Sequence, residues 1–164
     1  MSVAIQLEEL LDYSDHERAK WKAWVTANPK RLQLTFQPGG RFPTVGALFD
    51  HLFLVERRHL SRLRGATAPD STGLALVDWE GLFDYGALVR KEFRQCLAEM
   101  DDAAANETLT FTAKSGTFAM TRRKLAVHMV LHEIRHLAQL AYAARLAGQD
   151  PPGAHDLAFF EGIA

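Results

Sequence analysis

Four stretches of the chain show the apolar periodicity of amphipathic helices, and residues typical of turns separate them. We expect these helices at about Val3–Ala27, at Thr44–Leu63, near Asp78–Met100 and at Thr121–Leu146. Thr44 and Thr121 are suited to cap a helix N-terminus, and Asn28-Pro29 should stop the first helix. The chain has 164 residues, close to the commonest size of one domain. The pattern therefore predicts an all-α protein, a four-helix bundle that forms a single domain over residues 1–164.

The segment from Glu107 to Met120 interrupts this helical pattern just before the last helix. Residues Thr108–Thr112 alternate between threonine and an apolar residue, which is the period of a half-buried strand. Lys114-Ser115-Gly116 has the composition of a turn, and residues Thr117–Met120 are again suited to an extended conformation. We therefore predict a small β-hairpin here.

Charge and cysteine content exclude several functions. The chain has 19 basic and 20 acidic residues, so it lacks the basic excess that nucleic-acid binding requires. Its single cysteine, Cys96, forms no intramolecular disulfide and is expected in the core. No signal-peptide pattern opens the sequence, and no apolar run reaches the length of a membrane span. We therefore expect a cytoplasmic protein with neither nucleic acid nor a membrane as its partner.

The histidines of the last predicted helix are the most informative polar residues. His132 and His136 are four residues apart and lie among apolar residues, so their side chains are neighbours on one helix face. Buried imidazoles need polar partners, and one shared divalent metal ion would satisfy both. His128 continues the row, but three ligands in a row would span about 12 Å. We therefore assign His128 to the core or to a supporting role.

A third metal ligand has to come from another helix, and the second predicted helix offers His51 and His59. These two residues are eight positions apart, so at most one of them can join the site. Helical periodicity places His59 nearer the apolar centre and His51 near its edge. Periodicity alone does not decide between them.

Several motifs resemble those of the DinB-like (DinB/YfiT) superfamily of metal-dependent enzymes. They are Leu11-Asp12-Tyr13, the segments Pro43–His51 and His132–Leu140, and Ala147–Pro152. This resemblance spans nearly the whole chain and implies a bundle of up-down-down-up topology with a three-histidine metal site.

Mapped onto this sequence, the resemblance implies that His51, His132 and His136 are the ligands. One departure is that Leu137-Ala138 precede Gln139 where the family usually has a small basic-glycine-glutamine run. This chain therefore lacks that basic group directly after His136.

The resemblance also implies a chemistry. Three neutral imidazoles with open positions resemble catalytic zinc centres, and nickel, iron or manganese could also be bound. Some relatives are transferases or isomerases that use a low-molecular-weight thiol, whose reactive thiolate the metal would stabilise. A thiol-dependent S-transferase or isomerase acting on an unidentified small molecule is the function implied.

Two other functions fit parts of the sequence. His132-Glu133-Ile134-Arg135-His136 matches the H-E-x-x-H pattern of zinc peptidases, with Glu133 as the base and Glu161 as a downstream ligand. We favour His51 as third ligand, which leaves Glu133 as a surface or outer-sphere residue.

The other alternative is a bundle that binds a metal or a partner without catalysis. The last predicted helix is apolar on most sides, which favours a homodimer. The residues concerned are Val127, Val130, Leu131, Ile134 and Leu137.

Overall fold

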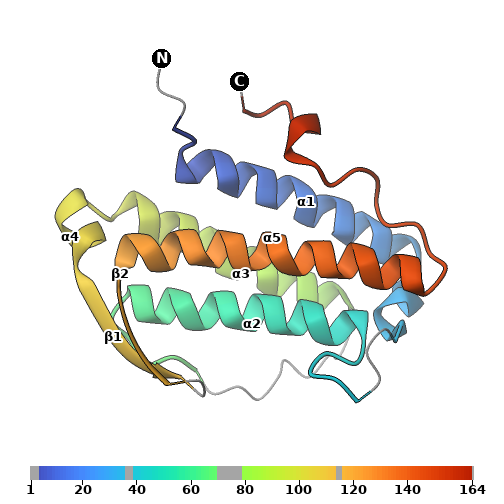
Figure 1. The fold of residues 1–164 in the computed structure, drawn as a ribbon, viewed down its shortest axis with the longest axis horizontal. Coiled ribbons are helices and arrows are strands. Elements are labelled where there is room, and N and C mark those ends of the chain that lie inside the picture. Colours follow the sequence, from blue (N-terminus) through green and yellow to red (C-terminus); the bar gives the residue numbers. More distant parts are fainter. Residues whose placement is uncertain (1–3, 36–38, 70–78, 114–115, 164) are drawn as a thin grey trace. The chain divides into compact units, whose positions relative to one another are not determined.

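The protein is mostly helical (Figure 1). The computed structural model describes residues 4–35, 39–69, 79–113 and 116–163. Its four long helices are α1 (Leu7–Ala27), α2 (Val45–Leu63), α3 (Trp79–Ala98) and α5 (Arg122–Leu146). Shorter elements are η1 (Pro29–Gln33), α4 (Asp102–Asn106), η2 (Leu157–Phe159) and the strands β1 (Thr108–Ala113) and β2 (Gly116–Thr121). Among the helices that the structure describes, none combines the length and the apolar character needed to cross a membrane.

The helix ends follow the capping residues. Thr44 and Thr121 cap α2 and α5 as predicted, and each hydroxyl accepts a hydrogen bond of 3.2 Å from the backbone N–H three residues later. The start of α1 lies four residues after the predicted Val3. Gln6 and Glu9 form a capping box there, which fixes the first turn at that point.

The short helix η2 was not predicted, and neither were α4 and η1. α4 begins where the Asp101 carboxylate accepts a hydrogen bond of 2.8 Å from the backbone N–H of Ala104. η1 lies inside the predicted loop that follows Asn28. Both are single turns set by a local cap, and they are too short to give a periodic apolar pattern.

The predicted hairpin is confirmed. β1 and β2 pair in antiparallel register from Thr108 opposite Thr121 to Ala113 opposite Gly116. Two residues of the predicted turn, Lys114 and Ser115, lie outside the described residues.

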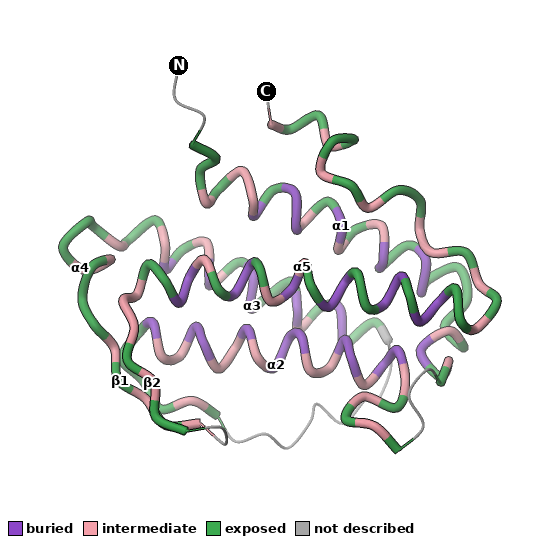
Figure 2. Tube along the Cα trace, in the orientation of Figure 1, coloured by how far each residue is buried: buried purple, intermediate pink, exposed green. Residues whose placement is uncertain are grey.

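The chain forms two compact units, one of residues 1–49 with 130–164 and one of residues 50–129. Helices α2 and α5 each continue from one unit into the other. Each long helix has a buried side and a more exposed side, as the alternating colours along α1, α2 and α5 show (Figure 2). The expectation of a single domain stays a prediction.

Within residues 50–129, α2 and α3 run parallel. Phe53 contacts Phe83 with ring centroids 5.8 Å apart, and further along both helices Glu56 pairs with Arg90 at 2.9 Å. Gly86 is required between these contacts, because a Cβ there would lie 2.7 Å from the Phe53 ring. The direction agrees with the two central helices of an up-down-down-up bundle.

Helix α5 runs antiparallel to α2 in the same unit. Arg122, at the start of α5, donates to the backbone carbonyl of Leu63 at the end of α2. Further along, the rings of His59 and His128 meet edge to face with centroids 5.5 Å apart. With α3 packed on α2, α2 packed on α5 and α1 bonded to α5 as described below, the predicted four-helix architecture is confirmed.

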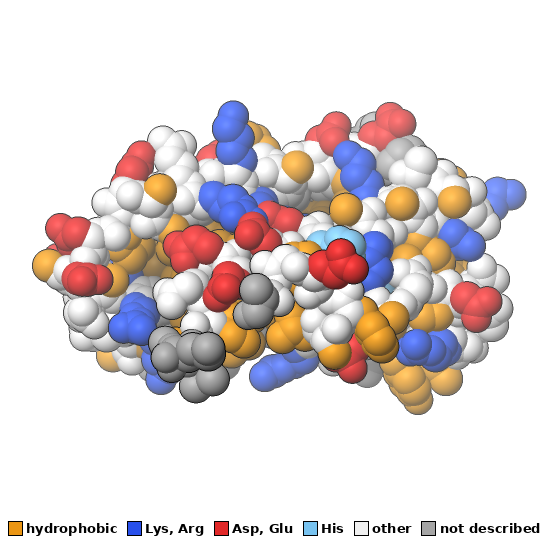
Figure 3. Space-filling model, turned by 90° about the horizontal axis from the view of Figure 1, so that it is seen from above, with side chains coloured by type: hydrophobic (Ala, Val, Ile, Leu, Met, Phe, Trp, Pro, Cys, Tyr) orange, Lys and Arg blue, Asp and Glu red, His pale blue; other side chains and the backbone are white. Residues whose placement is uncertain are grey.

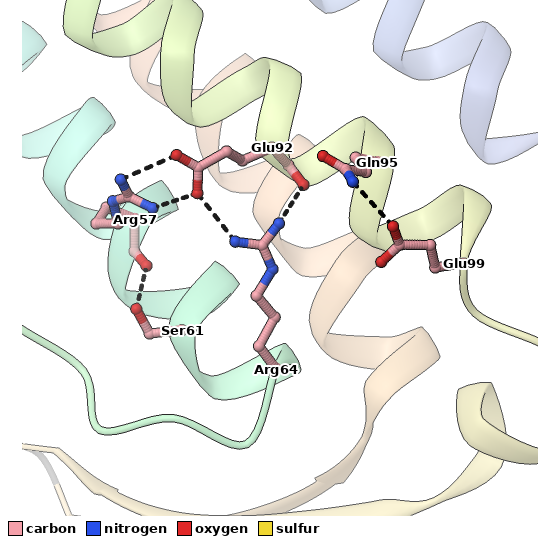
Figure 4. A network of polar contacts seen from close by, with 6 residues as sticks. All are labelled: Arg57, Ser61, Arg64, Glu92, Gln95 and Glu99. Carbon is pink, nitrogen blue, oxygen red and sulfur yellow. Dashed lines mark hydrogen bonds and ion pairs between the residues drawn. The ribbon is translucent and has the colours of Figure 1, made fainter.

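Two arginines, one in α2 and one just after it, are paired with a carboxylate of α3 (Figure 4). Arg57 and Arg64 both donate to the Glu92 carboxylate of α3, at 2.6 Å and 2.9 Å from its Oε2. These hydrogen bonds, first of all that from Arg57, lower the pKa of Glu92. Acidic and basic side chains are also interspersed over the face drawn in Figure 3.

In the other unit, the C-terminal segment packs on α1. Trp24 donates its indole N–H to the carbonyl of Asp150, and Tyr13 donates its hydroxyl to the carbonyl of His155, each at 2.7 Å. The His155 ring stacks on Trp21 with centroids 5.3 Å apart and bonds to the buried carboxylate of Glu17. The tail is therefore part of the folded unit.

Candidate metal centre

His132 and His136 lie one turn apart in the middle of α5, and their rings converge. Their Nε2 atoms are 3.2 Å apart and their ring centroids 4.4 Å apart. Two nitrogens at that separation, each ~2.05 Å from one metal ion, would subtend roughly 100° at it, close to a tetrahedral angle. The pair therefore fits a shared divalent ion, as the spacing predicted.

Gln139 orients the His136 ring. Its side-chain oxygen lies 2.5 Å from Nδ1 of His136, and an amide oxygen can only accept a hydrogen bond. Nδ1 therefore carries the proton, and the lone pair of the neutral ring is on Nε2, the atom that faces His132. Without a metal, Nε2–H of His132 can donate to this lone pair. A hydrogen-bonded orienting group of this kind is typical of metal-binding histidines.

His136 is held in its neutral form. Its side chain is buried, and this burial is the main cause that lowers its pKa, followed in the same direction by the positive charges of Arg135 and Arg41. The hydrogen bond with Gln139 opposes this shift. Neutral imidazole is the form that binds metal, so the surroundings favour binding near neutral pH.

His51 completes a group of three. It lies in the second turn of α2, whose start is fixed by the Thr44 cap. One ring nitrogen from each of His51, His132 and His136 lies within 4.8 Å of the other two, and this group could hold a metal ion. Among the described residues, it is the one such histidine, cysteine and carboxylate group.

His59, the other candidate on α2, is outside this group. It is buried, and Arg62 lies with its Nη1 3.0 Å from Nδ1 of His59. The guanidinium can only donate, so Nδ1 carries the lone pair and the proton is on Nε2. Burial, helped by the charges of Arg62, His128 and Arg58, lowers the pKa of His59 to about 3.

The predicted core position of His128 is wrong, because its side chain is exposed, while its supporting role stays a prediction. Exposure falls along the row, from exposed His128 through half-buried His132 to buried His136. Positions four apart differ by about 40° around a helix, so His128 lies roughly 80° around α5 from His136.

The prediction of Glu133 as a surface residue is also wrong. Its carboxylate is buried, accepts a hydrogen bond of 2.7 Å from the Ser14 hydroxyl, and forms an ion pair with Arg18 of α1. These bonds occupy both carboxylate oxygens. The role of this residue is to join α5 to α1, and no sequence motif indicated it.

The comparisons with known proteins agree with this geometry. The family model of the DinB superfamily matches residues 15–140, which include all three histidines of the group. A search of curated proteins found no match to the chain.

Proposed function

Because the chain belongs to the DinB superfamily, we propose that it is a metal-dependent enzyme that binds one divalent ion through His51, His132 and His136. We propose further that it uses a small thiol, either to transfer it to an electrophilic substrate or to isomerise one. The observation that carries the proposal is the convergence of two Nε2 atoms at 3.2 Å, with Nδ1 of His136 held by Gln139.

The helix register supports His51 as the third ligand. His59 of α2 meets His128 of α5 in an antiparallel pair. His51 is eight residues before His59, and His136 is eight residues after His128. Eight residues advance each helix by about 12 Å, so a continuation of the same register would bring His51 to the level of His136.

The donor set favours binding and activating a further ligand. Three neutral imidazoles leave the charge of a divalent ion uncompensated and leave coordination positions for a substrate. Bound there, the ion would supply Lewis acidity and stabilise a thiolate, the reactive form of a thiol. Zinc and nickel suit imidazole ligands best, and iron or manganese could also be accommodated.

The residues of this chain give the site its shape. His51, His132 and His136 hold the ion, and Gln139 keeps the His136 lone pair directed at it. The ion pair with Arg18 fixes Glu133, and with it the turn of α5 that carries His132 and His136. Glu133 is unsuited to act as the base of a peptidase, since Arg18 and Ser14 engage both of its oxygens.

Metal analysis of the purified protein tests the ligand assignment. We expect about one divalent ion per chain, loss of the ion in His132→Ala, and its retention in His128→Ala. The second variant is the matched control, because His128 is a histidine of the same helix with an exposed side chain. Full metal content in His132→Ala would refute the assignment.

Turnover is tested with the metal-loaded protein, with glutathione, bacillithiol or mycothiol as the thiol and a panel of electrophiles. We expect loss of thiol that depends on both the metal and His132. If the loaded protein turns over none of these pairs, the chain is a metal-binding bundle without this catalysis. Cleavage of casein that a chelator stops would instead support a peptidase.

A further inference from the structure

Two arginines flank the histidine pair of α5. Arg135 precedes His136 and lies three positions after His132, on the exposed side of the helix. Arg41 comes from the loop before α2, and its guanidinium carbon lies 5.1 Å from the centre of the Phe42 ring. The Phe42 ring in turn meets His136 edge to face, with centroids 5.7 Å apart and an interplanar angle of 84°. Phe42 thus contacts both a cation and a candidate metal ligand.

Neither of these arginines is neutralised within the described part of the chain. No hydrogen bond or ion pair engages the guanidinium of Arg41 or Arg135 there. Other arginines differ, since Arg57 and Arg64 share Glu92, as Figure 4 shows.

The way Arg41 is held leaves its hydrogen-bonding groups available. Stacking on an aromatic ring uses the face of the guanidinium, whereas its N–H donors lie along the edge. That edge matches a carboxylate or phosphate in a two-point contact. Arg41 is exposed, so a ligand entering from solvent can reach it.

We infer that the site selects a thiol or substrate that carries an anionic group, and that this group pairs with Arg41, with Arg135 adding to the attraction. This inference rests on the proposed function, because the anion is recognised while another atom of the same molecule binds the metal. Arg41 is therefore a specificity-determining residue.

The test uses the protein loaded with Co²⁺ in place of its native ion and two probes of equal length, mercaptoacetate and 2-mercaptoethanol. Each binds through its sulfur as a thiolate and releases its proton to the buffer. Binding is followed by the thiolate-to-cobalt charge-transfer absorption, so no turnover is needed. The measured quantity is the ratio of the two dissociation constants, which is compared between variants.

We expect Arg41→Gln to reduce the preference for mercaptoacetate by about 2- to 5-fold, the usual range for one exposed charge pair. Arg41→Lys should retain part of the preference, and Arg145→Gln all of it. Arg145 is the matched control, because it is also an exposed arginine of α5 with no ion pair among the described residues. Added salt should weaken the preference of the wild-type protein.

The outcomes separate this inference from the proposed function. An unchanged ratio in Arg41→Gln, with both thiols still bound to cobalt, would overturn the role of Arg41 alone. Failure of the wild-type protein to bind cobalt, or the absence of a charge-transfer band with either thiol, would overturn both proposals.

Discussion

His136 and His59 are both buried histidines on long helices, yet the ring of His136 faces a hydrogen-bond acceptor and the ring of His59 faces a donor. In each case the partner is three residues further along the same helix: Gln139 for His136 and Arg62 for His59. The glutamine oxygen requires a proton on Nδ1, which leaves Nε2 free to bind a cation. The guanidinium requires a lone pair on Nδ1, which puts the proton on Nε2 and adds a positive charge beside the ring. The neighbour therefore determines whether a buried histidine can act as a metal ligand.

The largest predicted effect concerns the ion pair between Glu133 and Arg18, which supports the part of α5 that carries His136. Replacing Glu133 by Gln leaves the guanidinium of Arg18 without its carboxylate in a poorly solvated position. We expect the free energy of unfolding to fall by about 3 to 5 kcal/mol, as is usual when one member of a buried pair is removed. Urea denaturation measures it. If Glu133→Gln unfolds at the wild-type urea concentration, the ion pair does not hold α5 in place.

Gln139→Arg converts the His136 arrangement into that of His59. We expect metal affinity to fall more than about 100-fold, because the arginine would favour the wrong tautomer and repel the ion. Gln139→Leu removes only the orienting bond and should lower the affinity by about 10- to 100-fold. Competition with a chromogenic chelator measures both. Equal affinities in the wild-type protein and Gln139→Arg would show that the orienting neighbour is unimportant.

The smallest effect concerns His59 and pH. Its pKa of about 3 in the folded chain lies below the value of 6.5 of a free histidine. As pH falls below about 6.5 the unfolded chain takes up a proton that the folded chain does not, so stability is lost toward acid pH. The free energy of unfolding is measured by denaturation between pH 6 and pH 4. Its slope against pH should be weaker by about 1 kcal/mol per pH unit in His59→Gln than in the wild-type protein.

His16→Gln is the control for that measurement, because the side chain of His16 is exposed and His16 is not among the residues that shift the pKa of His59. It should retain the pH slope of the wild-type protein. Parallel curves for His59→Gln and the wild-type protein would contradict the burial of an uncharged ring at position 59.

Much of the fold and part of the site could be predicted from periodicity and capping. The pairing of His132 and His136 follows from their spacing, and Thr44 and Thr121 mark their helix starts. The choice of His51 over His59 depends on which residues face each ring, and helical periodicity contains no such information. A resemblance to a family supplied that choice.

Other features depend on contacts between residues distant in sequence. Glu133 was misplaced because its partners, Ser14 and Arg18, are more than a hundred residues away. Fewer apolar residues of α5 are available to contact a second subunit than the sequence indicated, because Val130 and Leu137 are buried within the chain. A homodimer therefore stays a prediction, with Leu131 the exposed member of that set.

The packing of the C-terminal segment on α1 limits how far the chain can be truncated at its C-terminal end. The family match ends at residue 140, inside α5, whereas carbonyls at positions 150 and 155 accept hydrogen bonds from Trp24 and Tyr13. A fragment trimmed to the matched span would have a shortened last helix. It would also expose the carboxylate of Glu17 and the indole rings of Trp21 and Trp24 to water. The smallest fragment that folds is therefore longer than the matched span, and truncated variants should retain all residues through 155.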